Sequence, residues 1–181
     1  MEEKKIMALG FFDGVHRGHA ELLRRAKALA EQNGLSTEAI SFSTHPSAVL
    51  KGQSVPLLTS EDERRELIEA LGVGVRFLPF DGEMRDTPWD VFLEQRLREG
   101  AVGFVVGYDF SFGYQGQGNA EKIAVWCAEK GLLFEQVEAV MDGGEPVSSS
   151  RIRTLLAEGR LEEAGSLLGH SLRCMNANEE V

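Results

Sequence analysis

Residues 10–19 read Gly10-Phe11-Phe12-Asp13-Gly14-Val15-His16-Arg17-Gly18-His19. A short apolar run, residues 6–9, precedes this stretch, and a helical pattern begins near Ala20. A strand, a glycine-bearing turn and a helix N-terminus in this order favour an anion, because free N–H groups and the helix dipole attract negative charge. Gly18 would let phosphates approach the backbone, and the imidazoles of His16 and His19 would donate hydrogen bonds to them. We therefore predict a phosphate-binding turn; the alternative is an ordinary strand-to-helix turn with surface histidines.

Apolar strand patterns alternate with helical patterns along almost the whole chain. Strands are predicted at residues 6–9, 38–42, 73–80, 101–106 and 132–140. Helices are predicted at residues 18–32, 60–71, 88–98, 120–130, 151–158 and 161–168. This alternation predicts an α/β fold with a doubly wound, mostly parallel, five-stranded sheet. Ligands of such sheets bind beyond the carboxyl ends of the strands, so we expect the segments that follow residues 9, 106 and 140 to meet at one edge.

Local signals mark several ends of these elements. Ser60 with Glu63 forms a capping-box pattern, and Thr87 before Pro88 is typical of an N-cap followed by a first-turn proline. Residues 43–46 are expected to form a turn, residues 107–119 a glycine-rich loop and residues 142–146 a turn. Residues 1–169 are expected to form one domain, and residues 170–181 a loose tail.

The composition narrows the classes of partner. The 181 residues carry a formal net charge of −10, which argues against nucleic acid or an anionic membrane as a partner. No apolar stretch is long enough to span a bilayer and the N-terminus does not resemble a signal peptide, so a cytoplasmic location is expected. The two cysteines, Cys127 and Cys174, lack metal-ligand spacing and are expected to be reduced. We assign no protein residue as a metal ligand, but the negative net charge implies that a phosphate site needs concentrated donors and a divalent cation.

A serine run with arginines, residues 147–153, follows the fifth predicted strand. An N-cap needs only one serine, so one interpretation is capping alone and the other is a second phosphate clamp. In the second interpretation Ser149 and Ser150 contact the phosphates that leave, together with Arg151 or Arg153. The spacing does not choose between the two arginines.

The segment after the fourth predicted strand contains Asp109 between aromatic residues, including Phe110. It could be an ordinary loop whose rings fill the core. It could equally be a platform for a planar ligand ring, with Asp109 holding a polar substituent. His45 follows the second strand and lies before Pro46 on the expected turn, where it could approach an acceptor substrate.

With these motifs in view, the chain to about residue 169 resembles the adenylyltransferase module of bacterial bifunctional riboflavin kinase/FAD synthetases. The segments that carry the resemblance are residues 10–19, 42–46, 58–60, 107–113, 148–153 and 167–169. The HxGH pair alone indicates only the HxGH nucleotidyltransferase superfamily. Its combination with the Phe-Asp-Gly lead, the Asp-Phe-x-Phe-Gly loop and the serine run indicates the FAD-forming branch. The resemblance implies a Rossmann-like nucleotidyltransferase architecture.

The resemblance also implies a reaction in which ATP and FMN, with Mg²⁺, give FAD and pyrophosphate. It implies that His16 and His19 stabilise the ATP phosphates and the charge that develops on them. It favours Arg153 over Arg151 as the residue that holds the departing pyrophosphate with the serines. The remaining assignments that it implies are Gly10, Phe11, Asp13, Gly18, Ser149 and Ser150 on the ATP side, and His45, Asp109 and Phe110 on the flavin side.

The chain departs from the pattern of this family at several positions. Phe11 stands where many relatives have a small polar residue, Thr44 replaces a frequent proline, and Gln115 and Gln117 lie where relatives often carry basic residues. A riboflavin kinase module is absent, so FMN is expected to come from a separate riboflavin kinase. Two alternatives stay open: transfer to another phosphorylated acceptor, or a flavin- or nucleotide-binding module without catalysis.

Overall fold

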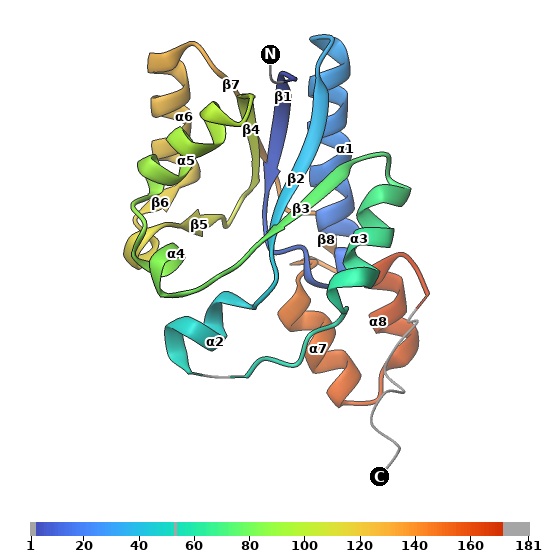
Figure 1. Ribbon diagram of the computed structural model, residues 1–181. Coiled ribbons are helices and arrows are strands. Elements are labelled where there is room, and N and C mark those ends of the chain that lie inside the picture. Colours follow the sequence, from blue (N-terminus) through green and yellow to red (C-terminus); the bar gives the residue numbers. More distant parts are fainter. Residues whose placement is uncertain (1–2, 53, 172–181) are drawn as a thin grey trace.

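The computed structural model describes residues 3–52 and 54–171, and its centre is a five-stranded sheet whose paired strands all run parallel (Figure 1). The strands are β1 (Lys5–Leu9), β2 (Ser36–Phe42), β3 (Gly74–Leu78), β4 (Ala101–Gly107) and β7 (Leu133–Val137). Their order is β3-β2-β1-β4-β7, so the chain winds outward from β1 in both directions. The predicted doubly wound α/β fold is confirmed, and β1 and β4 flank the switch point where such sheets bind ligands.

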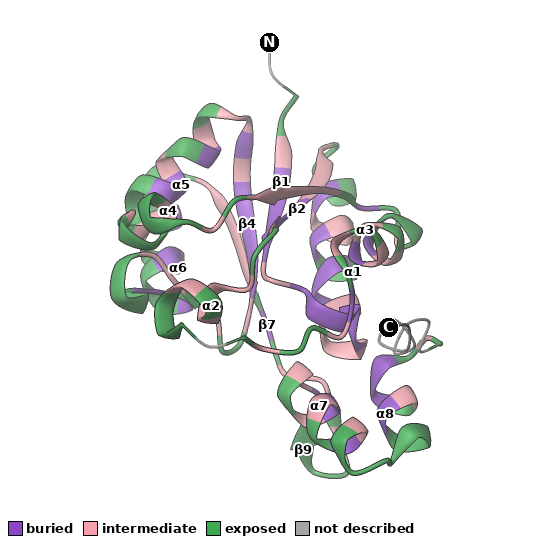
Figure 2. Cartoon of the chain, turned by 60° about the horizontal axis from the view of Figure 1, so that its bottom comes forward, coloured by how far each residue is buried: buried purple, intermediate pink, exposed green. Residues whose placement is uncertain are grey.

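Helices cover both faces of the sheet. Successive side chains of a strand point to opposite faces, so a strand that is apolar throughout needs packing partners on both. Ile6 and Ala8 of β1 face α1 (Arg17–Gln32) and α3 (Glu61–Ala70). Met7 and Leu9 face the side covered by α5 (Trp89–Arg98) and α6 (Ala120–Lys130). Figure 2 shows the result: the inner strands are buried, and the exposed residues gather on the outer sides of the helices. In the described ranges, no helix combines the length and apolar character needed to cross a membrane.

A pair of helices, α7 (Ser149–Ala157) and α8 (Leu161–Leu168), lies beyond the carboxyl ends of the strands (Figure 1). They enclose their own small core, which includes Val147, Ile152 and Leu167. This pair brings the serine run to the same edge as the turn that follows β1. The tail predicted for residues 170–181 lies mainly outside the described residues, from residue 172 onward.

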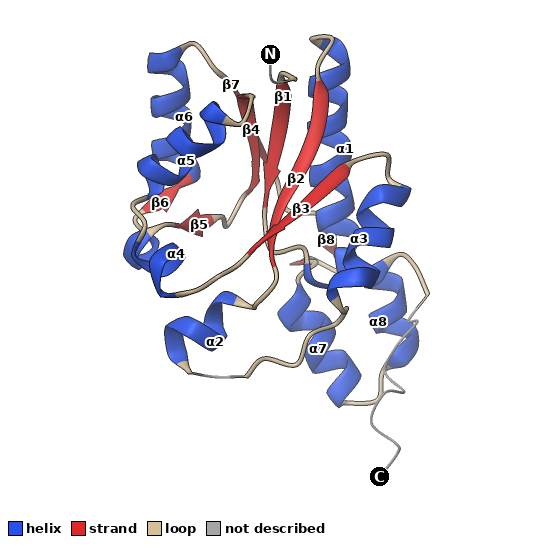
Figure 3. Ribbon diagram, in the orientation of Figure 1, coloured by secondary structure: helices blue, strands red, loops and turns tan. Residues whose placement is uncertain are grey.

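Short elements that the sequence pattern did not predict fill the segments between the long ones (Figure 3). They are α2 (Pro46–Lys51), α4 (Gly82–Asp86), the strand pairs β5 (Ser111–Phe112) with β6 (Gly118–Asn119) and β8 (Met141–Asp142) with β9 (Glu145–Pro146), and the 3₁₀ turns η1 (Asp13–Val15) and η2 (Tyr114–Gly116). Residues 107–119 are therefore not simply a loop.

The local signals had mixed outcomes. The capping box is present, because Ser60 accepts the Glu63 N–H and the Glu63 side chain accepts the Ser60 N–H. The N-cap prediction for Thr87 is wrong: Pro88 occupies the N-cap position, whereas Thr87 ends α4 and donates its hydroxyl to the Glu83 carbonyl. Cys127 is buried, and this burial raises the pKa of its thiol to about 11, as befits an unreactive cysteine. Cys174 lies outside the described residues.

Candidate active site

The turn after β1 is the most strained backbone of the described chain. Phe12 and Val15 adopt positive φ angles of 59° and 40°, a region that side chains with a Cβ rarely occupy. Both side chains are buried, so packing holds them in place. Gly10 is required here, because a Cβ on it would lie 2.9 Å from the Phe12 ring. Strain of this kind is typical of functional sites, where the surrounding structure fixes a conformation that the local sequence disfavours.

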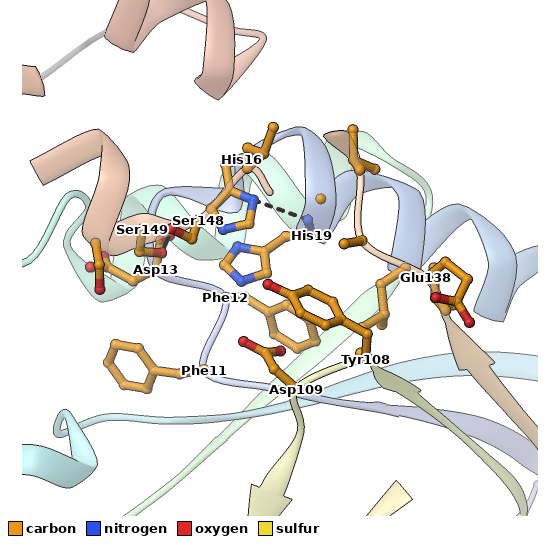
Figure 4. A pocket seen from close by; sticks show the side chains of 18 of the residues that line it. Phe11, Phe12, Asp13, His16, His19, Tyr108, Asp109, Glu138, Ser148 and Ser149 are labelled. Carbon is orange, nitrogen blue, oxygen red and sulfur yellow. Dashed lines mark hydrogen bonds between the residues drawn. The ribbon is translucent and has the colours of Figure 1, made fainter. Parts of the chain in front are cut away.

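His16 and His19 begin helix α1 as a stacked pair of rings. The ring centroids lie 3.6 Å apart at an interplanar angle of 14°, and Nδ1 of His16 accepts the backbone N–H of His19 at 3.2 Å (Figure 4). Because this nitrogen accepts, the neutral His16 ring carries its proton on Nε2. Gly18 leaves room for the folded-back ring: a Cβ there would lie 3.1 Å from Cε1 of His16.

Both imidazoles are neutral at physiological pH. Burial lowers the pKa of His16 to about 4, although the nearby Asp13 carboxylate opposes this shift. Burial also lowers the pKa of His19 well below its usual value, and the adjacent His16 imidazole and the Arg64 guanidinium lower it further. Nδ1 of His19 is buried and has no hydrogen-bond partner within the described residues. The pair therefore offers neutral N–H donors beside a cavity.

Asp13 is a buried carboxylate whose oxygens are already engaged. It accepts the backbone N–H groups of Leu58 and Thr59 and the Thr59 hydroxyl, and it forms an ion pair with Arg153. Asp13 thus ties the turn after β1 to the segment before α3 and to helix α7. Its carboxylate stabilises the site and holds Arg153 in place.

The two arginines of the serine run point in different directions. Arg153 lines the cavity beside the histidines, and its Nε donates to the Pro56 carbonyl at 2.7 Å. Arg151 turns instead to the β8–β9 hairpin, where it donates to the Asp142 carbonyl and lies 3.6 Å from carboxylate oxygens of Asp142 and Glu145. Arg153 is therefore the arginine that can reach a ligand in this cavity.

The serines at the start of α7 make different hydrogen bonds. Ser148 is the N-cap and accepts the Arg151 N–H, while Ser149 donates its hydroxyl to the Asp13 carbonyl at 2.8 Å. Ser149 and Ser150 occupy the first turn, where backbone N–H groups lack partners within the helix. All three serines line the cavity. The first turn of α7 thus adds an anion-attracting helix end opposite that of α1.

These groups surround a polar cavity of about 280 Å³ at the carboxyl edge of the sheet. Figure 4 shows the histidine pair between the Asp13–serine side and Tyr108, with Asp109 and Glu138 beyond it. The cavity lining is completed by residues that follow β4 and β7. The sequence-predicted residues that line it are Phe11, Asp13, His16, Gly18, His19, His45, Asp109, Ser149, Ser150 and Arg153.

A second cavity of about 400 Å³ adjoins the first and is mainly apolar. Aromatic side chains line much of it: Phe11, Phe12, Phe42, Phe80, Phe92, Phe110 and Phe112. Gly10 and Asp109 belong to this lining, as does Gln115. Phe11, Phe12, His19, Leu22, Gly107 and Asp109 line both cavities. The shared residues show that the two cavities meet beside His19.

His45 lies on the polar side of this boundary. It lines the first cavity, whereas the next residue, Pro46, lines the second. Nδ1 of His45 accepts the Ser47 N–H at 3.1 Å, so its neutral ring also carries the proton on Nε2. Burial lowers the pKa of His45, and the positive charge of Arg153 adds to this shift.

The sequence analysis missed several residues that build the site. Thr59 donates its N–H to Asp13 and accepts the Gly14 N–H, and Nε2 of His170 lies 2.7 Å from the Gly14 carbonyl oxygen. Arg64, fully buried on α3, binds the Phe11 carbonyl. A periodicity signal existed for Arg64: it lies four residues before Ile68, on the buried face of an amphipathic helix.

The described residues do not form a resident metal site. They contain no group of three or more His, Cys, Asp or Glu side chains that could hold a metal ion. Asp13 precedes His16 by three residues, and Arg153 and backbone N–H groups already occupy its oxygens. The donors around the polar cavity are imidazoles, a guanidinium and N–H groups, which suit an anion.

Comparison with known proteins identifies the family of the chain. A family model described as FAD synthetase matches residues 1–151. A bifunctional riboflavin kinase/FMN adenylyltransferase of Listeria monocytogenes is 36% identical over 170 residues, which cover 92% of this chain and 54% of that protein. A protein named FAD synthetase from the same species is 29% identical over 169 residues, covering 91% of this chain and 68% of that protein.

A solved structure extends the comparison to the fold. The crystal structure described as a macrolide-efflux protein from Streptococcus pneumoniae matches with a TM-score of 0.84 and 27% identity, covering 95% of this chain and 58% of that one. The chain spans about half the length of the curated bifunctional relatives it matches. The family model covers most of the chain, and the site motifs lie almost entirely within it. This chain belongs to the FAD synthetase family.

Proposed function

We propose that the chain transfers the adenylyl group of ATP to the phosphate of FMN, forming FAD and pyrophosphate. The observation that carries this proposal is the pair of adjoining cavities, one rich in anion donors and one lined by aromatic rings, which meet beside His19. A reaction that joins a nucleotide phosphate to a flavin phosphate needs two such sites in contact. Membership of the FAD synthetase family supports the same assignment.

ATP fits the polar cavity, with its phosphates between the N-termini of α1 and α7. His16 and His19 donate hydrogen bonds to the phosphate that is attacked, and Arg153 binds the pyrophosphate that leaves. The N–H groups of Ser149 and Ser150 contribute to the same clamp. Arg153 is suited to this role because it lines the cavity while Asp13 and the Pro56 carbonyl fix its orientation.

FMN fits the second cavity, with its ring system among the phenylalanines and its phosphate directed toward the boundary. Phe110 would contact the planar ring, and Asp109, at the boundary, would accept a hydrogen bond from a polar substituent of FMN. His45 would donate from Nε2 to the FMN phosphate as it approaches the polar cavity. Phe11 and Phe12 lie between the two substrates in this arrangement.

The chemical step is an in-line displacement at phosphorus. An oxygen of the FMN phosphate forms a bond to the α-phosphorus of ATP, and the bond from that phosphorus to the bridging oxygen breaks. The bridging oxygen leaves with the electron pair as part of pyrophosphate. A phosphate monoester is largely dianionic at neutral pH, so no base is needed to activate it. Two polyanions must nevertheless approach each other, which explains a site built from donors and fixed positive charge.

Magnesium enters this scheme with ATP, as the Mg·ATP substrate, because the described residues do not suit a resident metal. Residues 1–169 form the catalytic domain in this proposal, since α7 supplies Arg153 and α8 packs against it. FMN supplied by a riboflavin kinase and a cytoplasmic location are part of the same proposal.

One assay tests this function. The purified chain is incubated with Mg·ATP and FMN, or with a panel of other phosphorylated acceptors, and FAD and pyrophosphate are measured by chromatography. We expect FAD and pyrophosphate in equal amounts with FMN. Pyrophosphate release with another acceptor but no FAD from FMN would assign a different acceptor. Tight flavin binding without pyrophosphate release at any magnesium concentration would indicate a binding module instead. CTP in place of ATP tests the base preference.

A further inference from the structure

Arg64 is a fully buried arginine of α3 whose guanidinium binds the carboxyl ends of two strands. Its Nη1 donates to the Phe11 carbonyl at 2.8 Å and to the Ser41 hydroxyl at 3.2 Å. Its Nη2 donates to the Phe42 carbonyl at 3.2 Å. Ser41 in turn donates its hydroxyl to the same Phe11 carbonyl at 2.7 Å. One guanidinium thus joins the turn after β1 to the end of β2.

The same guanidinium fixes a side chain that lines both cavities. It lies over the Phe11 ring, 4.2 Å from the ring centroid, and the Phe11 and His45 rings form a T-shaped pair with a centroid distance of 4.6 Å. Stacking of a guanidinium on an aromatic face restricts both groups. Arg64 therefore determines where Phe11 lies, and through Phe11 it supports the His45 imidazole.

The charge of Arg64 requires a separate explanation. Its hydrogen bonds go to three uncharged oxygens, and its Nε has no hydrogen-bond partner among the described residues. Burial lowers the pKa of Arg64, and the charges of Asp13 and Glu61 oppose this shift. Positive charge from Arg64 reaches the site, where it contributes to the lowered pKa of both His19 and His45 after the larger effect of burial.

We propose that Arg64 is a positioning residue for the adenylyl transfer: its planar fork holds the Phe11 turn against β2, and its charge forms part of the positive field beneath the phosphate site. This inference rests on the proposed function. It assigns Arg64 no contact with substrate. Arg64 acts through the Phe11 carbonyl and ring, and through the field it exerts on His19 and His45.

Two variants separate the effect of the planar hydrogen-bonding geometry of Arg64 from the effect of its positive charge. Arg64→Lys keeps the charge but cannot reach both strand ends with a planar fork. Arg64→Gln removes the charge and keeps one N–H donor for the Phe11 carbonyl. The matched control is Arg65→Gln on the same helix. Arg65 donates to the Val75 carbonyl at 3.2 Å, and its half-exposed side chain lies 3.8 Å from Glu61.

The variants are compared by kcat, by KM for each substrate and by NMR titration of the imidazoles in the ligand-free protein. Urea titrations at several temperatures first identify a temperature at which each variant is folded. Both Arg64 variants should lose about 10²-fold in kcat, because the turn that carries the histidines shifts. Only Arg64→Gln should also raise the KM for ATP and raise the imidazole pKa of His19, because it removes a positive charge that lowers this pKa. Arg65→Gln should match the wild type within about twofold in kcat.

The outcomes are distinguishable. If folded Arg64→Lys has the kcat of Arg65→Gln, the fork has no positioning role and the inference is overturned; this test stands even if Arg64→Gln does not fold. Unchanged imidazole pKa values in folded Arg64→Gln would overturn the electrostatic part. A wild-type chain that forms no FAD rejects the proposed function, and the imidazole titration still decides whether Arg64 sets the field at the site.

Discussion

Acid should destabilise this protein through His16, by an amount that follows from its burial. The pKa of His16 is about 4 in the folded chain, against an ordinary value of 6.5. Between these two pH values the unfolded chain binds a proton that the folded chain does not. The stability that depends on the neutral ring is therefore complete above pH 6.5 and is lost as the pH falls toward 4.

The size of this loss can be worked out for one residue. A pKa shift of this size changes the free energy of unfolding by about 3 kcal/mol in all. About 2 kcal/mol of it should be lost between pH 7 and pH 5. His19 should add to the loss in the same direction, because its pKa is lowered as well.

The assay is urea unfolding at pH 7 and pH 5, followed by the fluorescence of Trp89 and Trp126, for the wild type and for His16→Asn. Asparagine does not titrate, and its side-chain oxygen can still cap α1 by accepting the His19 N–H. The wild type should lose about 2 kcal/mol more than His16→Asn over this interval. Equal losses in the two proteins would refute the reasoning, because they would show that the folded His16 ring takes up a proton as readily as the unfolded one.

Three further predictions concern the site itself. His19→Ala and Arg153→Ala, compared as folded proteins, should lose about 10²- to 10³-fold in kcat, since each removes a donor aimed at the reacting phosphates; near wild-type FAD formation would remove the residue from the mechanism. Arg153→Ala should also lower the free energy of unfolding, because it leaves the buried Asp13 carboxylate without its ion-pair partner. Phe110→Ala should raise the KM for FMN about 3- to 10-fold and leave the KM for ATP unchanged, and an equal rise in both would place the flavin elsewhere. Gly18→Ala should lower kcat with little change in melting temperature, because the new Cβ presses on His16; unchanged turnover would show that the ring position is not critical.

Much of the fold was predictable because its signals are local. The five strands are apolar runs bounded by turns, and a helix such as 161–168 has a clear repeat and a glycine after it. The short helices α2 and α4 gave no such signal, since one turn of helix shows little periodicity. Thr87 was misplaced because a threonine before a proline is a sound N-cap signal only when no helix ends there, and α4 ends at Asp86.

The site was predictable in part for a related reason. His16, His19 and the serine run lie where strands meet helices, so topology alone brings them to one edge of the sheet. The partners of Asp13 could not be predicted, because Leu58, Thr59 and Arg153 are distant in sequence and meet only in the fold. Arg64 was missed because a charged residue in a helix normally faces solvent.

The central claim is that ATP and FMN occupy adjoining cavities that meet beside His19. The measurement that tests it most directly is a crystal structure of the chain with FMN and an ATP analogue whose bridge between the α- and β-phosphorus cannot be cleaved. The account predicts the triphosphate between His16 and Arg153, and the flavin ring among the phenylalanines with its phosphate near His45. A flavin bound outside the apolar cavity, or a triphosphate without contact to either His16 or Arg153, would contradict it.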